Sequence, residues 1–110
     1  MDEKSIYVNI TENHFKVWGY TYFIDNLRGT HTIIAYWGKI GLQMDRLQKK
    51  EKVFFTRSDA HDYIWLKIDE KIGKGYSSMP NWQYWDAISS GKPISQLIRL
   101  IEIYQKAEEV

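Results

Sequence analysis

The sequence contains no cysteine. Disulfide bonds, thiol catalysis and cysteine-ligated metal sites are therefore excluded. No apolar run approaches the roughly 18 residues that a membrane-spanning helix needs. The first residues, Met1–Ser5, carry no apolar segment behind a basic start, so we expect no signal peptide. We expect an intracellular protein, cytoplasmic if its source is bacterial.

Catalytic and cofactor-binding patterns are also missing. The histidines His14, His31 and His61 are scattered along the chain. There is no His-x-x-x-His pair, no pair of carboxylates on one strand and no glycine-rich phosphate loop. His61 and Asp62 are neighbours on a predicted helix, so they point in different directions. We expect no enzymatic activity, no metal site and no cofactor.

Aromatic residues, in contrast, are abundant. The 110 residues are 44% hydrophobic and include 5 Trp, 8 Tyr and 4 Phe, which predicts one folded domain with a modest core. The net charge of +1 indicates no partner by itself, but residues 39–57 hold six lysines and arginines against two acidic residues. This basic middle is either an electrostatic footprint for a ligand or a solvated, lysine-rich hairpin.

The first half of the chain has the alternation and composition of β-strands. Turn residues separate these segments at 11–13 and 25–29, so the second and third form a hairpin. Gly19 suggests a bulge in the second strand. Trp37 and Lys39 should share one face of the third strand, because side chains alternate along a strand. The expected strands are 5–10, 14–24, 30–40 and 50–56.

A helical period replaces this alternation after residue 57. Ser58 is a suitable N-cap, and Gly73 or Gly75 should end the helix. We expect Trp65, like Trp18 of the second strand, to lie in the core. The predicted apolar stripe consists of Ala60, Ile64, Ile68 and Ile72.

The last residues, 79–110, should form a helical extension. Residues 77–81 interrupt the chain, and Asn81 could cap a short helix. Pro93 suits the start of a second, amphipathic helix. Trp82, Trp85 and Ile88 should share a face of the first helix, and the second carries a stripe of Ile94, Leu97, Ile98, Ile101 and Tyr104. We expect this stripe to pack on the sheet or on a second copy.

Strands followed by helices predict an α+β fold. We expect an antiparallel sheet of about four or five strands packed on one main helix, with the C-terminal helical extension added.

The order of these motifs resembles the WGR domain, a module named for a Trp-Gly-Arg motif and found in several poly(ADP-ribose) polymerases and in bacterial proteins. Trp37-Gly38-Lys39-Ile40-Gly41 is similar to Trp-Gly-Arg-Val-Gly. The resemblance covers about residues 5–78, so we expect a WGR-like domain at 1–78 and the extension at 79–110. Three further features carry it: Asn13-His14-Phe15 as the opening of the second strand, Phe54 or Phe55 with Ser58 and Ala60 as the helix entry, and Ala60, Ile64, Ile68, Lys71 and Gly75-Tyr76 at the helix spacing.

The resemblance implies binding of DNA, or RNA as a second choice, at strand ends or breaks that carry a 5′-phosphate. The tryptophan would stack on the nucleic acid and basic residues would contact phosphates. Two positions depart from the motif: Lys39 replaces the arginine and His14 replaces a lysine, and both should weaken binding. The expected contact residues are Trp37, Gly38, Lys39, Asn13, His14, Lys50, Lys52 and Arg57.

A second hypothesis remains open. The aromatic surface around Trp37, or around Trp82 and Trp85, could bind a protein partner or a second copy through the C-terminal helix. The near-neutral net charge favours this alternative, because many nucleic-acid-binding domains are far more basic.

Overall fold

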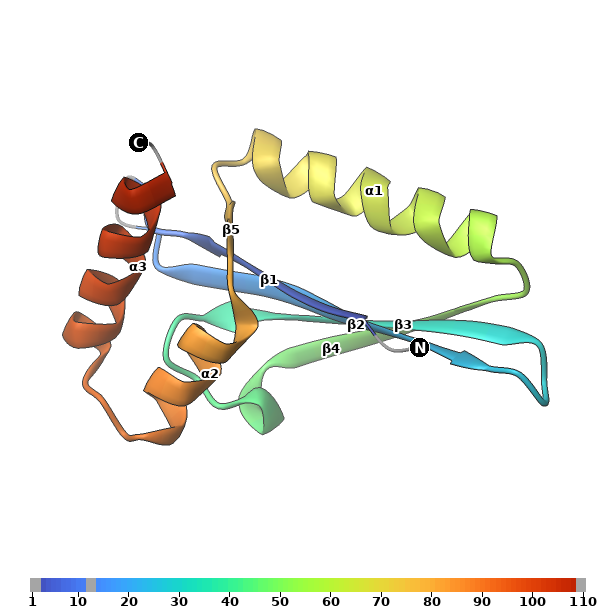
Figure 1. Cartoon of the computed structure of the whole chain (residues 1–110), viewed down its shortest axis with the longest axis horizontal. Helices are drawn as coiled ribbons and strands as arrows, with labels where there is room; N and C mark the ends of the chain where they lie inside the picture. Colours follow the sequence, from blue (N-terminus) through green and yellow to red (C-terminus); the bar gives the residue numbers. More distant parts are fainter. Residues whose placement is uncertain (1–2, 12–13, 109–110) are drawn as a thin grey trace.

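The computed structural model describes residues 3–11 and 14–108. Within them the chain forms a five-stranded antiparallel sheet and three α-helices, which confirms the predicted α+β fold (Figure 1). The strand order is β4-β3-β2-β1-β5. The elements are β1 (Glu3–Asn9), β2 (Lys16–Asp25), β3 (Thr30–Lys39), the 3-10 turn η2 (Met44–Arg46), β4 (Gln48–Phe54), α1 (Arg57–Gly73), β5 (Ser77–Met79), α2 (Asn81–Ser89) and α3 (Ile94–Glu108).

The β2–β3 hairpin has the expected turn. Asp25 Oδ1 accepts hydrogen bonds from the backbone N–H groups of Leu27 and Arg28, and Gly29 takes a φ of 66°. The bulge expected at Gly19 is wrong, because β2 pairs with β1 and β3 in unbroken register. A Cβ at Gly19 would lie 2.7 Å from the carbonyl oxygen of Ser5, so this glycine permits a close approach of β1 instead.

Helix α1 covers one face of the sheet, as predicted. It begins at Arg57, so Ser58 lies inside it, and the N-cap is Thr56 instead. The side-chain oxygen of Thr56 accepts a hydrogen bond from the backbone N–H of Asp59 at 3.1 Å. Gly75, with a φ of 96°, follows the helix end, which confirms the predicted stop.

The apolar stripe of α1 is shorter than predicted. Ala60, Ile64 and Ile68 are buried, but Ile72 is 55% exposed. Each step of four residues turns the helix by about 400°, so the stripe drifts by about 40° per step. After three steps this drift has carried Ile72 away from the sheet. Trp65 is 62% exposed and does not lie in the core as expected, because it is about 100° around the helix from Ile64.

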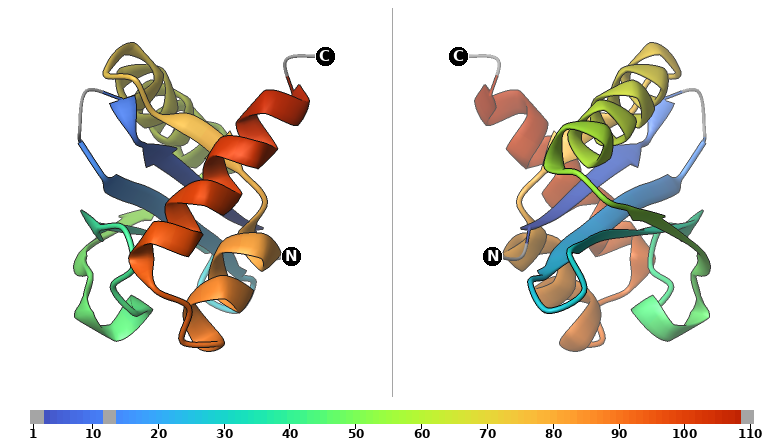
Figure 2. Two further views of the ribbon diagram at one scale, coloured as in Figure 1. Left: turned by 90° about the vertical axis from the view of Figure 1, so that its left-hand side faces the viewer. Right: turned by 90° about the vertical axis from the view of Figure 1, so that its right-hand side faces the viewer.

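Buried side chains form two clusters on opposite faces of the sheet. Neighbouring strand residues alternate between them: Tyr7 and Trp18 belong to one, Ile6 and Val17 to the other. We call the cluster under α1 the α1-side core and the other the α2/α3-side core. Figure 2 (left) shows α3 running diagonally in front of the strand ends, with α2 near its lower end. The α1-side core contains Trp18, Tyr20, Tyr22, Ile33, Ala60, Ile64 and Ile68.

The C-terminal helices build the α2/α3-side core. Leu97 and Ile101 of α3 are buried there, so the centre of the predicted stripe packs within the chain itself. Among the α2 residues whose side chains are described, Tyr84 and Ala87 are buried, and no sequence pattern had singled them out. Of the predicted α2 face, Trp85 and Ile88 are partly buried against the same core, and the side chain of Trp82 lies outside the description.

The segment 77–81 is not a simple interruption. Residues Ser77–Met79 form β5, which pairs with β1 through Ile6↔Met79 and Val8↔Ser77. This strand forms because the segment that follows α1 pairs with the otherwise unpaired edge of β1. No local sequence pattern predicts this contact. Pro80 rather than Asn81 precedes α2 as its cap residue. No described helix is long and apolar enough to cross a membrane.

Candidate nucleic-acid interface

The motif Trp37-Gly38-Lys39-Ile40-Gly41 lies at the end of β3, where alternation gives its residues opposite roles. Gly38 and Ile40 face the α2/α3-side core, in which Ile40 is buried. A Cβ at Gly38 would lie 2.8 Å from a methyl carbon of Leu47, so a larger residue there would have to displace the Leu47 side chain. Trp37 and Lys39 point to the other face, beside α1, as their shared register predicted.

The C-terminal helices hold the loop that follows the motif. Gly41 has a φ of 99°, and its N–H donates a hydrogen bond to the Tyr84 hydroxyl oxygen at 3.2 Å. Burial raises the pKa of Tyr84 to about 12, although this hydrogen bond acts in the opposite direction. The N–H of Ile40 donates to the carbonyl oxygen of Phe15 at 2.9 Å. One side of the motif is thereby fixed, and the other is left open.

A cleft of about 610 Å³ opens on the α1 side of the motif. Its walls come from the starts of β2 and β4, the ends of β1 and β3, and the chain around the end of α1. We call it the lysine cleft. It is lined by Asn9, His14, Lys16, Trp37, Gly38, Lys39, Gln48, Lys71, Lys74 and Tyr76.

A second cleft, of about 200 Å³, lies between α1 and the strands β2, β3 and β4. Trp37 and Lys71 line both clefts, so the two meet at these side chains. We call the second one the aromatic cleft. It is lined by Trp18, Ala35, Trp37, Lys50, Tyr63, Lys67 and Lys71.

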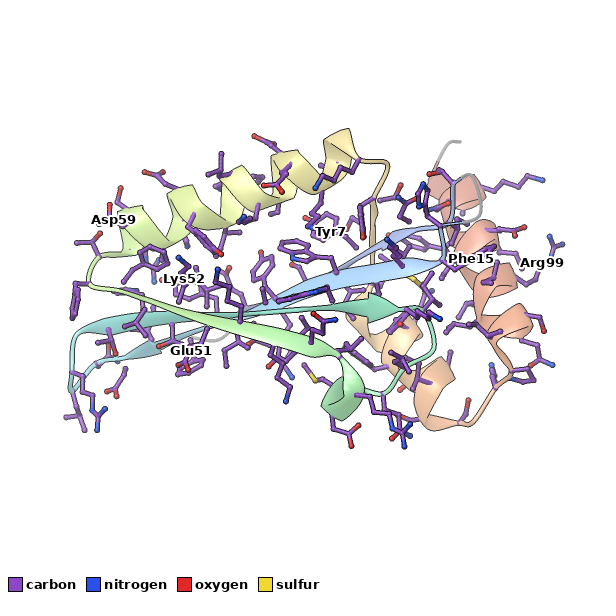
Figure 3. All side chains as sticks on the ribbon, turned by 180° about the vertical axis from the view of Figure 1, so that it is seen from behind. Tyr7, Phe15, Glu51, Lys52, Asp59 and Arg99 are labelled. Carbon is purple, nitrogen blue, oxygen red and sulfur yellow. The ribbon has the colours of Figure 1, made fainter. Side chains whose placement is uncertain are left out.

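The two clefts concentrate positive charge. Together they expose six lysines, and no acidic side chain is among their described lining residues. Lys16 lies directly opposite Lys39 in the β2–β3 register, an arrangement of like charges that destabilises a sheet. On β4, Glu51 points away from α1 whereas Lys52 points toward it (Figure 3). The fold therefore gathers lysines on the α1 side of the sheet.

One carboxylate compensates part of this charge. Glu70 of α1 lies 3.6 Å from the ammonium of Lys67 and 3.5 Å from that of Lys74. The charge of Lys67 is the main cause that lowers the pKa of Glu70. Both ion pairs are largely exposed, so they contribute little to stability.

Lys71 occupies the junction of the two clefts. Its ammonium lies 5.5 Å from the ring centre of Tyr76 and 5.9 Å from that of Trp18. Burial lowers the pKa of Lys71; Lys74, Lys67 and Lys16 lower it further, and only Glu70 acts against them. A positive charge at this point is destabilised by its surroundings and would gain from an anion.

The structure brings together most, but not all, of the predicted contact residues. Trp37, Gly38, Lys39 and His14 line the lysine cleft, and Lys50 lines the aromatic cleft. Lys52 and Arg57 line neither cleft.

Lys52 is further along β4, with its ammonium 5.9 Å from the ring centre of Tyr63. Arg57 follows the far end of β4, which pairs with His31, whereas Trp37 pairs with the first residue of β4. The strand length separates Arg57 from the clefts. Asn13 lies outside the described residues.

Sequence reasoning missed four lysines of the clefts: Lys16, Lys67, Lys71 and Lys74. Two signals could have found them. Lys16 begins the alternating series that continues with the buried Trp18 and Tyr20. Lys71 lies within about 20° of Ile64 around α1, because seven residues make nearly two full turns. It is therefore Lys71, and not Ile72, that continues the apolar stripe.

Replacing Lys71 by methionine tests whether the lysine serves the fold or a ligand. Its pKa in the folded chain is below that of an unfolded lysine, so at pH 7 the protonated side chain opposes folding. Methionine removes this penalty and keeps favourable contact with the rings of Trp18 and Tyr76. We expect the melting temperature of Lys71→Met not to fall and its binding of anionic ligands to weaken. A lower melting temperature with unchanged binding would make Lys71 a packing residue.

No protein-family model, curated protein or solved structure matches the chain. The resemblance to the WGR domain therefore rests on the motif residues, and function has to be argued from the site. Within residues 3–11 and 14–108, no group of three or more histidine or acidic side chains is placed to hold a metal ion.

Proposed function

We propose that the chain is a non-enzymatic module that binds nucleic acid through the lysine and aromatic clefts. The observation that carries the proposal is the position of Trp37, a half-buried aromatic side chain at the junction of two clefts lined by lysines. Lysines attract phosphates, and an aromatic ring stacks on bases or sugars.

The resemblance to the WGR domain supports DNA as the ligand and a strand end or break with a 5′-phosphate as the preferred feature. The clefts offer ammonium groups and aromatic faces but few fixed hydrogen-bond donors and acceptors. Binding would therefore depend on phosphates and stacking rather than on the base sequence.

Lys39 is the position that tests the electrostatic part of this proposal. If it neutralises one phosphate, Lys39→Ala should reduce the slope of log affinity against log salt by about one unit. Lys39→Arg should strengthen binding, because arginine makes a bidentate contact with phosphate. The measurement is fluorescence anisotropy of a 5′-phosphorylated DNA duplex with a nick or a blunt end, at several salt concentrations.

Lys49→Ala is the matched control for Lys39→Ala. Lys49 belongs to the neighbouring strand but faces the other side of the sheet, with its ammonium 5.9 Å from the ring centre of Tyr36. Its replacement removes the same charge and should leave the slope nearly unchanged. Equal salt slopes for wild type, Lys39→Ala and Lys49→Ala would contradict phosphate contact by Lys39.

The alternative function is protein interaction, and one observation favours it. Trp65, Leu66 and Ile72 are more than half exposed on α1, away from the clefts. Large exposed apolar patches mark surfaces that bind a partner, and Trp65 and Ile72 lie about two helical turns apart on nearly the same side of α1. A dimer through α3 would have to use Ile94 and Ile103, because Leu97 and Ile101 are buried within the chain. A folded protein that shows no salt-sensitive binding of DNA or RNA would favour this alternative.

A further inference from the structure

The aromatic cleft is a partly open slot between helix α1 and the sheet. Tyr63, Lys67 and Lys71 of α1 form its roof, and the strand residues Trp18, Ala35 and Trp37 form its floor. Its volume of about 200 Å³ suits a single flat ring better than a base pair, which carries a second base and a second backbone.

Ala35 creates the space in this slot. On the face of β3 below α1 it lies between Ile33, which belongs to the α1-side core, and Trp37, which packs partly against that core. Because the side chain of Ala35 is only a methyl group, a hollow remains between these two larger side chains. The hollow is bounded by the rings of Trp18, Trp37 and Tyr63. Aromatic walls of this kind suit a nucleobase, because every base has a face that stacks.

Positive charge continues from the slot to the motif. Lys50 and Lys67 flank the aromatic cleft on the sheet side and on the helix side. Lys71 lies at the junction, and Lys16 and Lys39 follow in the lysine cleft. Trp37 lines both clefts, so the two sets of ammonium groups meet at its side chain.

We propose that the site binds an unpaired nucleotide, so that a single-stranded segment enters the aromatic cleft while its phosphates contact the lysine cleft. This inference rests on the proposed function and specifies its ligand as single-stranded nucleic acid, such as the overhang of a duplex end, rather than a fully paired end.

The experiment compares four fluorescent probes of matched sequence: a closed circular duplex, a 5′-phosphorylated blunt duplex, the same duplex with a short 5′-phosphorylated overhang, and the overhang strand alone. The duplex with an overhang should bind more tightly than the blunt duplex by about 5- to 150-fold per stacked base. An RNA version of the single strand tests whether the sugar matters.

Three variants locate the effect. Ala35→Leu fills the slot without changing any charge, so the advantage of the overhang duplex over the blunt duplex should disappear. Lys50→Gln should weaken binding of the overhang, and Lys49→Gln, one residue away on the opposite face of β4, should not. If a melting experiment shows that Ala35→Leu does not fold, the comparison of Lys50→Gln with Lys49→Gln tests the inference instead.

Equal affinity of wild type for the blunt duplex and the overhang duplex would overturn this inference and leave the proposed function standing. An overhang advantage that survives in Ala35→Leu, or equal effects of the two lysine variants, would also overturn it. If the folded protein binds none of the probes at low salt, the inference and the proposed function are both overturned.

Discussion

Replacing Trp37 by alanine is expected to weaken binding of nucleic acid by about 1–3 kcal/mol, the range measured for loss of one base–aromatic stack. Trp37 lines both clefts, so its ring is available from either side of the junction. Stacking releases few counterions, so the loss should persist at high salt, unlike the loss caused by removing a lysine. Affinity measured at two salt concentrations, for the same overhang duplex, separates the two contributions.

Trp65→Ala is the matched control for this experiment. Unlike the half-buried Trp37, Trp65 is 62% exposed, and it lies on the outer surface of α1 and lines neither cleft. Its replacement should leave affinity unchanged. Because Trp37 also packs partly against the α1-side core, the melting temperature of each variant has to be measured. If Trp37→Ala is folded and binds as tightly as wild type, the ring makes no stack.

The second large effect concerns stability. Ile68→Ala should lower the free energy of unfolding by about 2–5 kcal/mol, as truncations of buried isoleucine do. Ile68 is 5% exposed and packs with Ile64 against the sheet. A domain of this size is stable by only about 5–15 kcal/mol, so the variant could be partly unfolded at 37 °C. Denaturant titration followed by circular dichroism measures the change.

Ile72→Ala provides the comparison on the same helix. Ile72 is 55% exposed, one step of four residues beyond Ile68, and its truncation should change the free energy of unfolding by less than about 0.5 kcal/mol. The pair tests the drift of the apolar stripe directly. Similar losses for both variants would mean that Ile72 is packed after all, and a small loss for Ile68→Ala would mean that another face of α1 meets the sheet.

The order and type of most elements could be predicted because their signals are local. Alternation along 14–24 and 30–40 predicted β2 and β3, and turn residues between them predicted the hairpin. The helix ended where Gly75 allowed a positive φ. The errors arose where a tertiary contact overrode a local rule. Gly19 was predicted to form a bulge but instead allows a close approach of β1, and Ser77–Met79 was predicted to be a break but pairs with β1.

The sequence by itself determined that Trp37 and Lys39 share one face of a strand and that Gly38 and Ile40 share the other, because the strand period of two is a property of the backbone. It also determined that α1 has a buried side. Only the tertiary structure decided which lysines join Trp37. Lys16, Lys39 and Lys71 come from β2, β3 and the end of α1, and they meet because β2 pairs with β3 and α1 crosses the sheet above them. No spacing along the chain predicts that these three lysines come together. Their proximity depends on which side of each strand and helix is buried in the two cores.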